Sequence, residues 1–158
     1  MFLSFCAASY FMNYKTSIKI WEDLAQHDVF WAVNHFTQYE GDVWDVEDFL
    51  RTGTTEVNAI LRLLKQQQWL PPNIDLALDF GCGIGRLTRA LYPYFDKIEG
   101  VDASDSIIYQ ARLRNTDFLD KIEFFVCHDA NLNVLGPKKY SFILSTLTFQ
   151  YITIPESM

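Results

Sequence analysis

The sequence has few of the residues on which disulfide-rich domains and zinc sites depend. Only three of its 158 residues are cysteines, and they lie far apart, at Cys6, Cys82 and Cys127. No CxxC pair occurs, and the three histidines form no HExxH pattern, which disfavours a structural zinc site. We therefore expect no metal site and a reducing, cytoplasmic setting.

Basic runs and long apolar runs are also missing. The longest basic run is Lys138-Lys139 and the net charge is −7, so the surface repels phosphate backbones and nucleic acid is disfavoured as a partner. The apolar start MFLSFCAASYFM is too short to span a bilayer, and no Lys or Arg precedes it as a secretory signal requires. We expect no membrane partner. Residues 1–15 are interpreted as a disordered leader, or as a stretch upstream of a translation start at Met12.

The composition is that of an ordinary globular domain. Apolar residues make up 49% of the chain and charged residues 21%, which disfavours disorder. A chain of this length forms one domain that buries roughly 70% of its unfolded surface.

Residues 16–72 predict a helical segment. In TSIKIWEDLAQ, apolar residues at three- and four-residue spacing fall on one helix face: Ile18, Trp21 and Leu24 or Ala25. The stretch VFWAVNHF continues with a further short helix or turn. Asp45 caps a helix over VEDFLRT, and Gly53 suits its end because glycine adopts the left-handed conformation without penalty.

The clearest helix of this segment is expected to start at Thr54 or Thr55. Its apolar residues follow the helical template, and Pro71-Pro72 stops it. The aromatic-rich segment as a whole is a candidate lid over a substrate site.

Residues 73–158 change to alternating strands and helices. Short apolar runs predict strands at 74–80, 97–102, 121–129 and 139–146, and helices lie between the first three of them. Ser104 is the expected cap of the helix over DSIIYQARLRN. This alternation predicts an α/β fold with a doubly wound, mainly parallel sheet, preceded by the helical segment.

A glycine-rich turn joins the first expected strand to the helix after it. In LDFGCGIGRLTRAL, Gly81, Gly83 and Gly85 give G-x-G-x-G, and Arg86 stands where a dinucleotide fingerprint has its third glycine. Asp102 ends the next strand about 20 residues on, where a carboxylate accepts hydrogen bonds from both hydroxyls of a ribose. The ligand therefore carries a ribose near the turn and need not carry a pyrophosphate. Alternatively, the glycines serve only a tight turn.

The same stretches resemble the motifs of a known family. LDFGCGIGRLTRAL is similar to motif I of the class I methyltransferases that use S-adenosylmethionine, and IEGVDAS looks like their second motif. The resemblance continues through FVCHDA and YSFILSTLTFQYI, so it covers about residues 74–154. It implies a Rossmann-like sheet, S-adenosylmethionine as cofactor and methyl transfer to an acceptor.

The resemblance also implies roles for individual residues. The stretch Gly81 to Gly85 would pass under the methionine portion of the cofactor, and Asp79 would hold that loop or the ammonium end. Asp102 would bind the ribose. The remaining implied cofactor-binding residues are Ala103 beside the adenine, Asp129 and Ala130 at the adenine edge, and Arg86 toward the carboxylate. Cys82 lies within the loop and is expected to pack as a small apolar side chain rather than act as a nucleophile.

The acceptor and the catalytic residues are not predicted by the sequence. Ser145-Thr146-Leu147-Thr148 follows the fourth strand, where relatives that methylate amines of nucleic acids carry an Asn or Asp followed by Pro-Pro and an aromatic, so a small-molecule acceptor is the expectation. Two alternatives stay open. One is a non-catalytic module that binds S-adenosylmethionine or a nucleotide, and the other is an NAD(P)-dependent oxidoreductase, against which Arg86 counts.

Only four of the family's seven strands are expected in these 158 residues. The chain is therefore interpreted as a fragment, a truncated gene product, or a half-domain completed by another chain. The stretch SFILSTLTF would then form an open sheet edge without proline or charge, the composition of a self-associating strand. We accordingly expect self-association and little methyl transfer from this chain alone.

Overall fold

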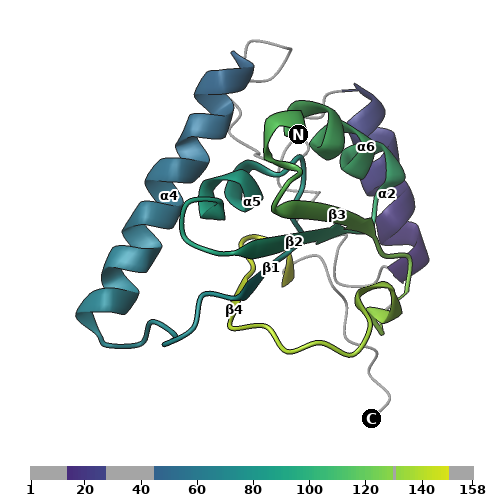
Figure 1. Ribbon diagram of the computed structural model, residues 1–158. Helices are drawn as coiled ribbons and strands as arrows, with labels where there is room; N and C mark the ends of the chain where they lie inside the picture. Colours follow the sequence, from purple (N-terminus) through teal and green to yellow (C-terminus); the bar gives the residue numbers. More distant parts are fainter. Residues whose placement is uncertain (1–13, 28–44, 130, 150–158) are drawn as a thin grey trace.

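The computed structural model describes residues 14–27, 45–129 and 131–149 of the chain (Figure 1). The expected leader lies outside this part except for its last two residues, which begin helix α2 (Tyr14–His27). The stretch VFWAVNHF also lies outside the described residues.

The second helix, α4 (Val46–Gln66), is a single long helix where two were expected. Asp45 caps it as predicted, because its side chain accepts a hydrogen bond from the amide of Asp48. The prediction that Gly53 ends a helix is wrong. Gly53 lies inside α4, and a Cβ built on it would stand 2.3 Å from the carbonyl oxygen of Arg86, so the glycine permits close packing.

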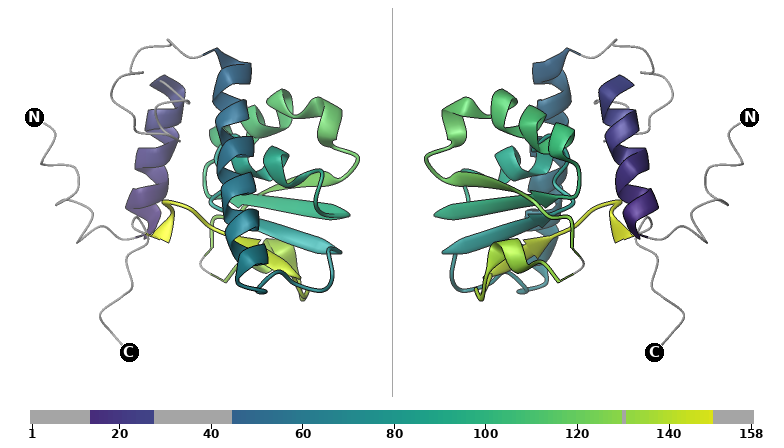
Figure 2. Two further views of the ribbon diagram at one scale, coloured as in Figure 1. Left: turned by 90° about the vertical axis from the view of Figure 1, so that its left-hand side faces the viewer. Right: turned by 90° about the vertical axis from the view of Figure 1, so that its right-hand side faces the viewer.

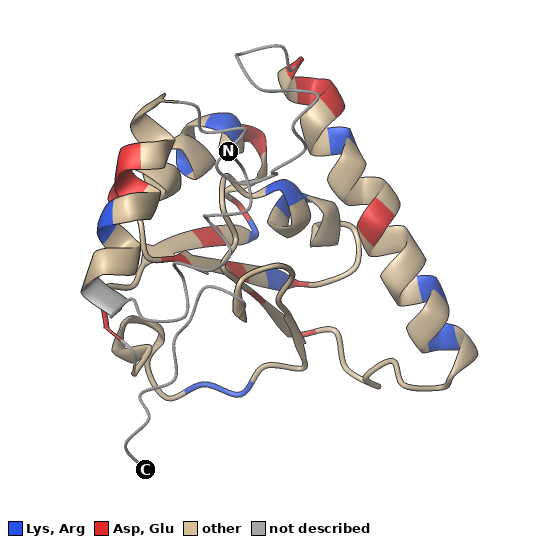
Figure 3. Ribbon diagram, turned by 180° about the vertical axis from the view of Figure 1, so that it is seen from behind, with Lys and Arg blue, Asp and Glu red and all other residues tan. Residues whose placement is uncertain are grey.

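The charges along α4 match the direction of its helix dipole. Glu47 and Asp48 lie in the first turn and Lys65 in the last. Figure 3 shows red acidic positions at one end of α4 and blue basic positions toward the other. The helix ends at Gln66, before the two prolines, and Gln68 reverses the chain with a positive φ of 59°.

Within the described residues, four parallel strands form one sheet in the order β3-β2-β1-β4. The strands are β1 (Leu76–Phe80), β2 (Lys97–Asp102), β3 (Ile122–Val126) and β4 (Phe142–Leu144). Helix α5 (Arg86–Leu91) connects the first two strands, and α6 (Asp105–Arg114) with the short η3 (Thr116–Phe118) connects the second and third. Ser104 caps α6 as predicted, by accepting a hydrogen bond from the amide of Ile107.

The chain reverses its direction of travel across the sheet after β3. The connection to β4 returns past β2 and β1 and contains η4 (Asn133–Leu135). A right-handed crossover in this direction runs over the opposite face of the sheet from α5 and α6. Figures 1 and 2 show α4, α5 and α6 on one side and the η4 connection on the other. The doubly wound, parallel α/β fold is therefore confirmed.

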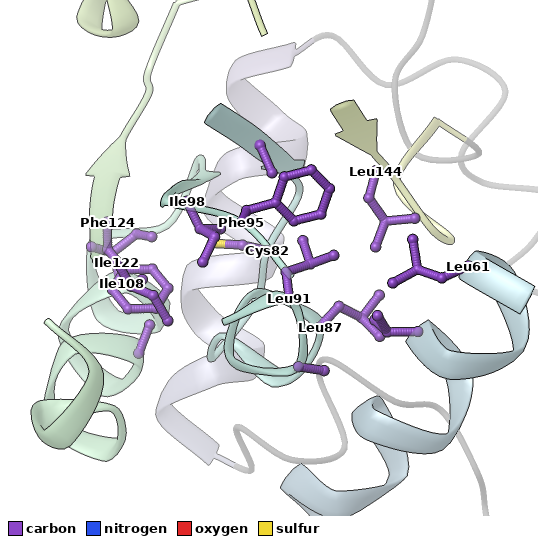
Figure 4. Packing of buried hydrophobic residues seen from close by; sticks show 14 residues of the cluster. Leu61, Cys82, Leu87, Leu91, Phe95, Ile98, Ile108, Ile122, Phe124 and Leu144 are labelled. Atoms are coloured by element: carbon purple, nitrogen blue, oxygen red, sulfur yellow. The ribbon is translucent and has the colours of Figure 1, made fainter. Parts of the chain in front are cut away.

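The main core lies between the sheet and the helices. Leu61 of α4, Leu87 and Leu91 of α5 and Leu144 of β4 are buried in one cluster, and Figure 4 shows these side chains pointing toward one another. A smaller cluster on the other face joins Leu78, Val101, Cys127 and Leu135. Because α4 contributes directly to the main core, this helix is part of the same folded unit as the sheet.

Candidate functional site

The candidate site lies at the carboxyl ends of the strands, at the point where the order of the strands reverses. Strand β1 pairs with β2 on one side and with β4 on the other. The chain proceeds from β1 to β2 and β3 on one side and then returns to β4 on the other side of β1, so the strand order reverses at β1. Ligands of open α/β sheets bind at such a switch point.

The glycine-rich turn occupies this edge directly after β1. Gly81, Gly83 and Gly85 have φ angles of 77°, 54° and 85°, in the left-handed region that other residues rarely adopt. The amides of Gly81 and Cys82 both donate to the carbonyl oxygen of Val101, at 2.8 and 3.0 Å. These two hydrogen bonds therefore hold the turn against the end of β2.

Two of the three glycines are also required by internal packing. A Cβ on Gly81 would lie 2.0 Å from the Thr148 hydroxyl oxygen, and that hydroxyl donates to the carbonyl oxygen of Phe80 at 3.1 Å. A Cβ on Gly85 would lie 2.8 Å from Asn115 Nδ2 and 2.8 Å from the ring of Phe124. The glycine pattern thus has a structural explanation at these two positions, whatever it binds.

Asp102 ends β2 with its side chain at the turn. Its Oδ2 accepts a hydrogen bond from the Gly83 amide at 3.1 Å, and its Oδ1 accepts one from the Ser104 amide at 3.2 Å. Burial raises the pKa of Asp102, while these main-chain hydrogen bonds favour its charged form. Each carboxylate oxygen offers about two acceptor positions, so the oriented carboxylate can still accept bonds from two neighbouring hydroxyls.

Asp79 points into the core beneath the turn. It is 1% exposed, and its Oδ2 accepts a hydrogen bond from the Thr88 hydroxyl of α5 at 2.6 Å. Burial raises the pKa of its carboxyl to about 6. The contact seen in the structure holds the start of α5, so Asp79 supports the loop.

Arg86 turns toward α4. Its guanidinium pairs with Glu56 at 2.7 Å, donates to the Thr52 hydroxyl at 3.3 Å and lies over the ring of Phe49. Together with the close contact of Gly53, these bonds tie α4 to the first turn of α5. A direct contact of Arg86 with a cofactor stays a prediction.

The other predicted residues lie around the same edge. Cys82 is buried in the main core, and burial raises the pKa of its thiol well above the ordinary value, as expected of a side chain that packs and does not react. Ala103 directly follows Asp102. Asp129 is exposed just after β3, and its Oδ1 accepts a hydrogen bond from the Asn131 amide at 2.9 Å. Ala130 lies outside the described residues.

Sequence reasoning missed two residues at this edge. Glu22 of α2 accepts hydrogen bonds from Ser104 and Ser106, and Thr148 packs on Gly81. Both contacts join segments more than 60 residues apart, so no local pattern could reveal them. Within the described residues, no group of three or more His, Cys, Asp or Glu could hold a metal ion, and no helix is long and apolar enough to cross a membrane.

Comparison with known proteins agrees with this geometry. A family profile described as "Methyltransferase domain" matches residues 77–158, which begin in β1 and include the turn and Asp102. No curated protein matches the chain significantly.

Two solved structures have a similar fold. A SAM-dependent methyltransferase from Leishmania major is 18% identical and covers 93% of this chain and 56% of its own, with a TM-score of 0.60. Magnesium protoporphyrin IX methyltransferase from Synechocystis, crystallised with bound SAM, is 22% identical and covers 85% of this chain and 62% of its own, with a TM-score of 0.52. The chain thus spans about three-fifths of the length of these proteins. It belongs to the methyltransferase domain family, as its resemblance to the class I S-adenosylmethionine-dependent enzymes implied.

Proposed function

We propose that this chain binds S-adenosylmethionine and belongs to an enzyme that transfers the cofactor's methyl group to a small-molecule acceptor. The observation that carries the proposal is the pairing of Asp102 with the Gly83 amide at the switch point of the sheet. Membership of the methyltransferase domain family and the bound SAM of the Synechocystis protein support the choice of ligand.

The proposed roles are those that the resemblance to the class I methyltransferases implies for these positions. Asp102 accepts hydrogen bonds from the ribose hydroxyls, and Ala103 flanks the adenine, whose edge meets Asp129 and Ala130. The turn from Gly81 to Gly85, with Cys82 inside it, passes under the methionine end. Asp79 and Arg86 hold this turn from below and from the side, through Thr88 and Glu56.

The cofactor supplies an activated methyl group on a sulfonium, so the protein contributes chiefly by orienting the two reactants and excluding water. The residues after β4 are the proposed acceptor side. Leu147 and Phe149 are exposed there, Phe149 stacks on Phe80 with ring centroids 5.5 Å apart, and Leu147 has a positive φ of 60°. An exposed apolar surface next to the turn favours an acceptor with an apolar portion.

The test substitutes Asp102 and follows the affinity for S-adenosylhomocysteine, the demethylated cofactor, by calorimetric titration. Asp102→Asn removes the charge from the proposed ribose contacts and should weaken binding by about 1–3 kcal/mol. Asp105→Asn is the matched control, because Asp105 lies three residues away with an exposed side chain that pairs with His128. This control should bind within about twofold of the unaltered chain.

Three outcomes contradict the proposal. The unaltered chain could bind no S-adenosylhomocysteine, or it could bind NAD more tightly. Alternatively, Asp102→Asn could lower the unfolding temperature while its folded fraction binds with unaltered affinity, which would make Asp102 a structural residue.

A further inference from the structure

Hydrogen bonds join helix α2 to the start of α6, next to the candidate site. The carboxylate of Glu22 accepts hydrogen bonds from the Ser104 hydroxyl at 2.5 Å and from the Ser106 amide at 3.3 Å, and also from the Ser106 hydroxyl. Burial raises the pKa of Glu22, but the bonds from the two serines outweigh it and leave the pKa below the ordinary value. Glu22 is therefore held as a carboxylate at the start of α6, where the helix dipole also favours a negative charge.

Ser104 connects this carboxylate to Asp102. Its hydroxyl donates to Glu22 and also accepts from the Ile107 amide at 3.1 Å, which caps α6. Its own amide donates to Asp102 Oδ1. One residue thus joins α2, the first turn of α6 and the carboxylate at the end of β2.

Apolar packing supports the same docking. Ala25, one helical turn after Glu22, packs against a buried cluster of Phe49, Leu50, Ile84 and Ile107. Ile84 belongs to the glycine-rich turn and Ile107 to α6, so α2 packs on a cluster to which both elements that flank Asp102 contribute. Figure 1 shows α2 next to α6, at the end of the molecule away from α4.

Resting on the proposed function, we propose that Glu22 is a positioning residue of the cofactor site, which couples the docking of α2 to binding of the ribose at Asp102. The amides of Ser104 and Gly83 both donate to the Asp102 carboxylate and help to fix its orientation. Loss of the Glu22 bonds frees the first turn of α6 and so loosens the carboxylate. Because coupling between two sites is reciprocal, a ligand on Asp102 must in turn stabilise the docking of α2.

The experiment compares Glu22→Ala with Asp23→Ala in the full chain. Asp23 is the next residue of α2 and its side chain is exposed, so the control makes the same substitution on the same helix without touching the serines. Affinity for S-adenosylhomocysteine is measured by titration. Amide hydrogen exchange of residues 14–27 is followed with and without saturating ligand.

In the unaltered chain and in Asp23→Ala, the ligand should slow exchange in α2. In Glu22→Ala, affinity should fall about five- to tenfold and the slowing of α2 should disappear. Exchange in β1 and β2 should remain unchanged, which separates loss of coupling from loss of the fold. The inference is overturned if Glu22→Ala binds S-adenosylhomocysteine with unaltered affinity, or if the ligand still slows amide exchange in α2 of this variant. Either result leaves the proposed function intact. No binding of S-adenosylhomocysteine by the unaltered chain overturns both.

Discussion

Gly81 holds two parts of the candidate site in contact. Its φ of 77° and the 2.0 Å approach of the Thr148 hydroxyl oxygen to a built Cβ leave no room for a side chain. This contact brings the segment after β4 against the end of β1, next to the proposed ribose contact. The distance between the glycine-rich turn and the segment after β4 therefore depends on the lack of a Cβ at Gly81.

Gly81→Ala should destabilise the fold by about 2–4 kcal/mol, because left-handed strain adds to the clash with Thr148. Gly136→Ala is the matched control. Gly136 also has a positive φ, of 65°, but its ψ of −178° lies in a region that essentially only glycine adopts, and a Cβ there meets nothing within 4 Å, so the loss in urea unfolding should reflect backbone strain alone, about 1–3 kcal/mol. If removal of the Thr148 side chain restores no stability to Gly81→Ala, the clash with Thr148 is not the cause of the loss. The double variant Gly81→Ala with Thr148→Ala should recover part of the loss.

Asp79 should make the stability of the fold depend on pH. Burial raises the pKa of its carboxyl from 3.8 to about 6, so the folded chain binds this proton more tightly than the unfolded chain. The stability from this group is fully present below about pH 4 and is lost as the pH rises through about 6. Asp79→Asn keeps an acceptor for Thr88 and removes the charge. The free energy of unfolding should therefore rise by roughly 2–3 kcal/mol at pH 7.5.

At pH 4.5 the gain from the same substitution should be smaller, about 1 kcal/mol, because the folded chain still holds the proton while the unfolded chain has already lost most of it. Urea unfolding of both chains at the two pH values measures the difference. A gain of equal size at both would mean that the charge of Asp79 is not the cause.

At the scale of elements, α4 is the support behind the glycine-rich turn. Gly53 lets α4 approach the Arg86 carbonyl, while Glu56 and Thr52 bind the Arg86 guanidinium. These contacts set the distance between the helix and the first turn of α5. Helix α4 thus supports the glycine-rich turn directly, which is a role beyond that of a lid over the substrate site.

Gly53→Ala should lower the free energy of unfolding by about 1–3 kcal/mol, although alanine favours helix over glycine by about 1 kcal/mol. The cause is the overlap of the new Cβ with the Arg86 backbone, which must move. Thr55→Ala, two residues along α4 with an exposed side chain, gives the control and should be neutral or slightly stabilising. If Gly53→Ala instead raises the free energy of unfolding by the roughly 1 kcal/mol that the helix propensity of alanine predicts, the close contact between Gly53 and the Arg86 backbone does not limit the packing of α4 on α5.

The elements predicted correctly from the sequence are those with local signals. The bounds of β2 and the Ser104 cap, for example, follow from adjacent residues. The prediction that Gly53 ends a helix is wrong because the sequence does not distinguish a glycine that ends a helix from one that permits close packing. Arg86 and Glu22 find their partners 30 and 82 residues away, so tertiary packing decides their roles.

At the scale of the whole molecule, the sheet presents β4 as an edge among the described residues. Strand β4 pairs with β1 alone there, and Ile143 is 61% exposed on it. Edge strands with exposed apolar side chains are templates for pairing with another chain. We therefore predict that the 158-residue chain self-associates through this edge.

Size-exclusion chromatography with light scattering should show a mass that rises with concentration, and Ile143→Lys should reduce that rise because a charge on an edge strand opposes pairing. Leu63→Lys, which adds the same charge to an exposed apolar residue of α4, controls for a change of charge alone. A monomer at all concentrations, or an Ile143→Lys chain that associates like the unaltered one, contradicts the prediction.

The most direct test of the central claim, that the glycine-rich turn and Asp102 form an S-adenosylmethionine site, is a nuclear magnetic resonance titration of the ¹⁵N-labelled chain with S-adenosylhomocysteine. The amides of Gly83 and Ser104 both donate to Asp102, so a ribose bound to this carboxylate must shift their signals. The account predicts saturable shifts of these two amides and of Gly81 and Gly85, and no saturable shifts with NAD. Unshifted signals at saturating S-adenosylhomocysteine, or the same shifts at lower concentrations of NAD, would contradict it.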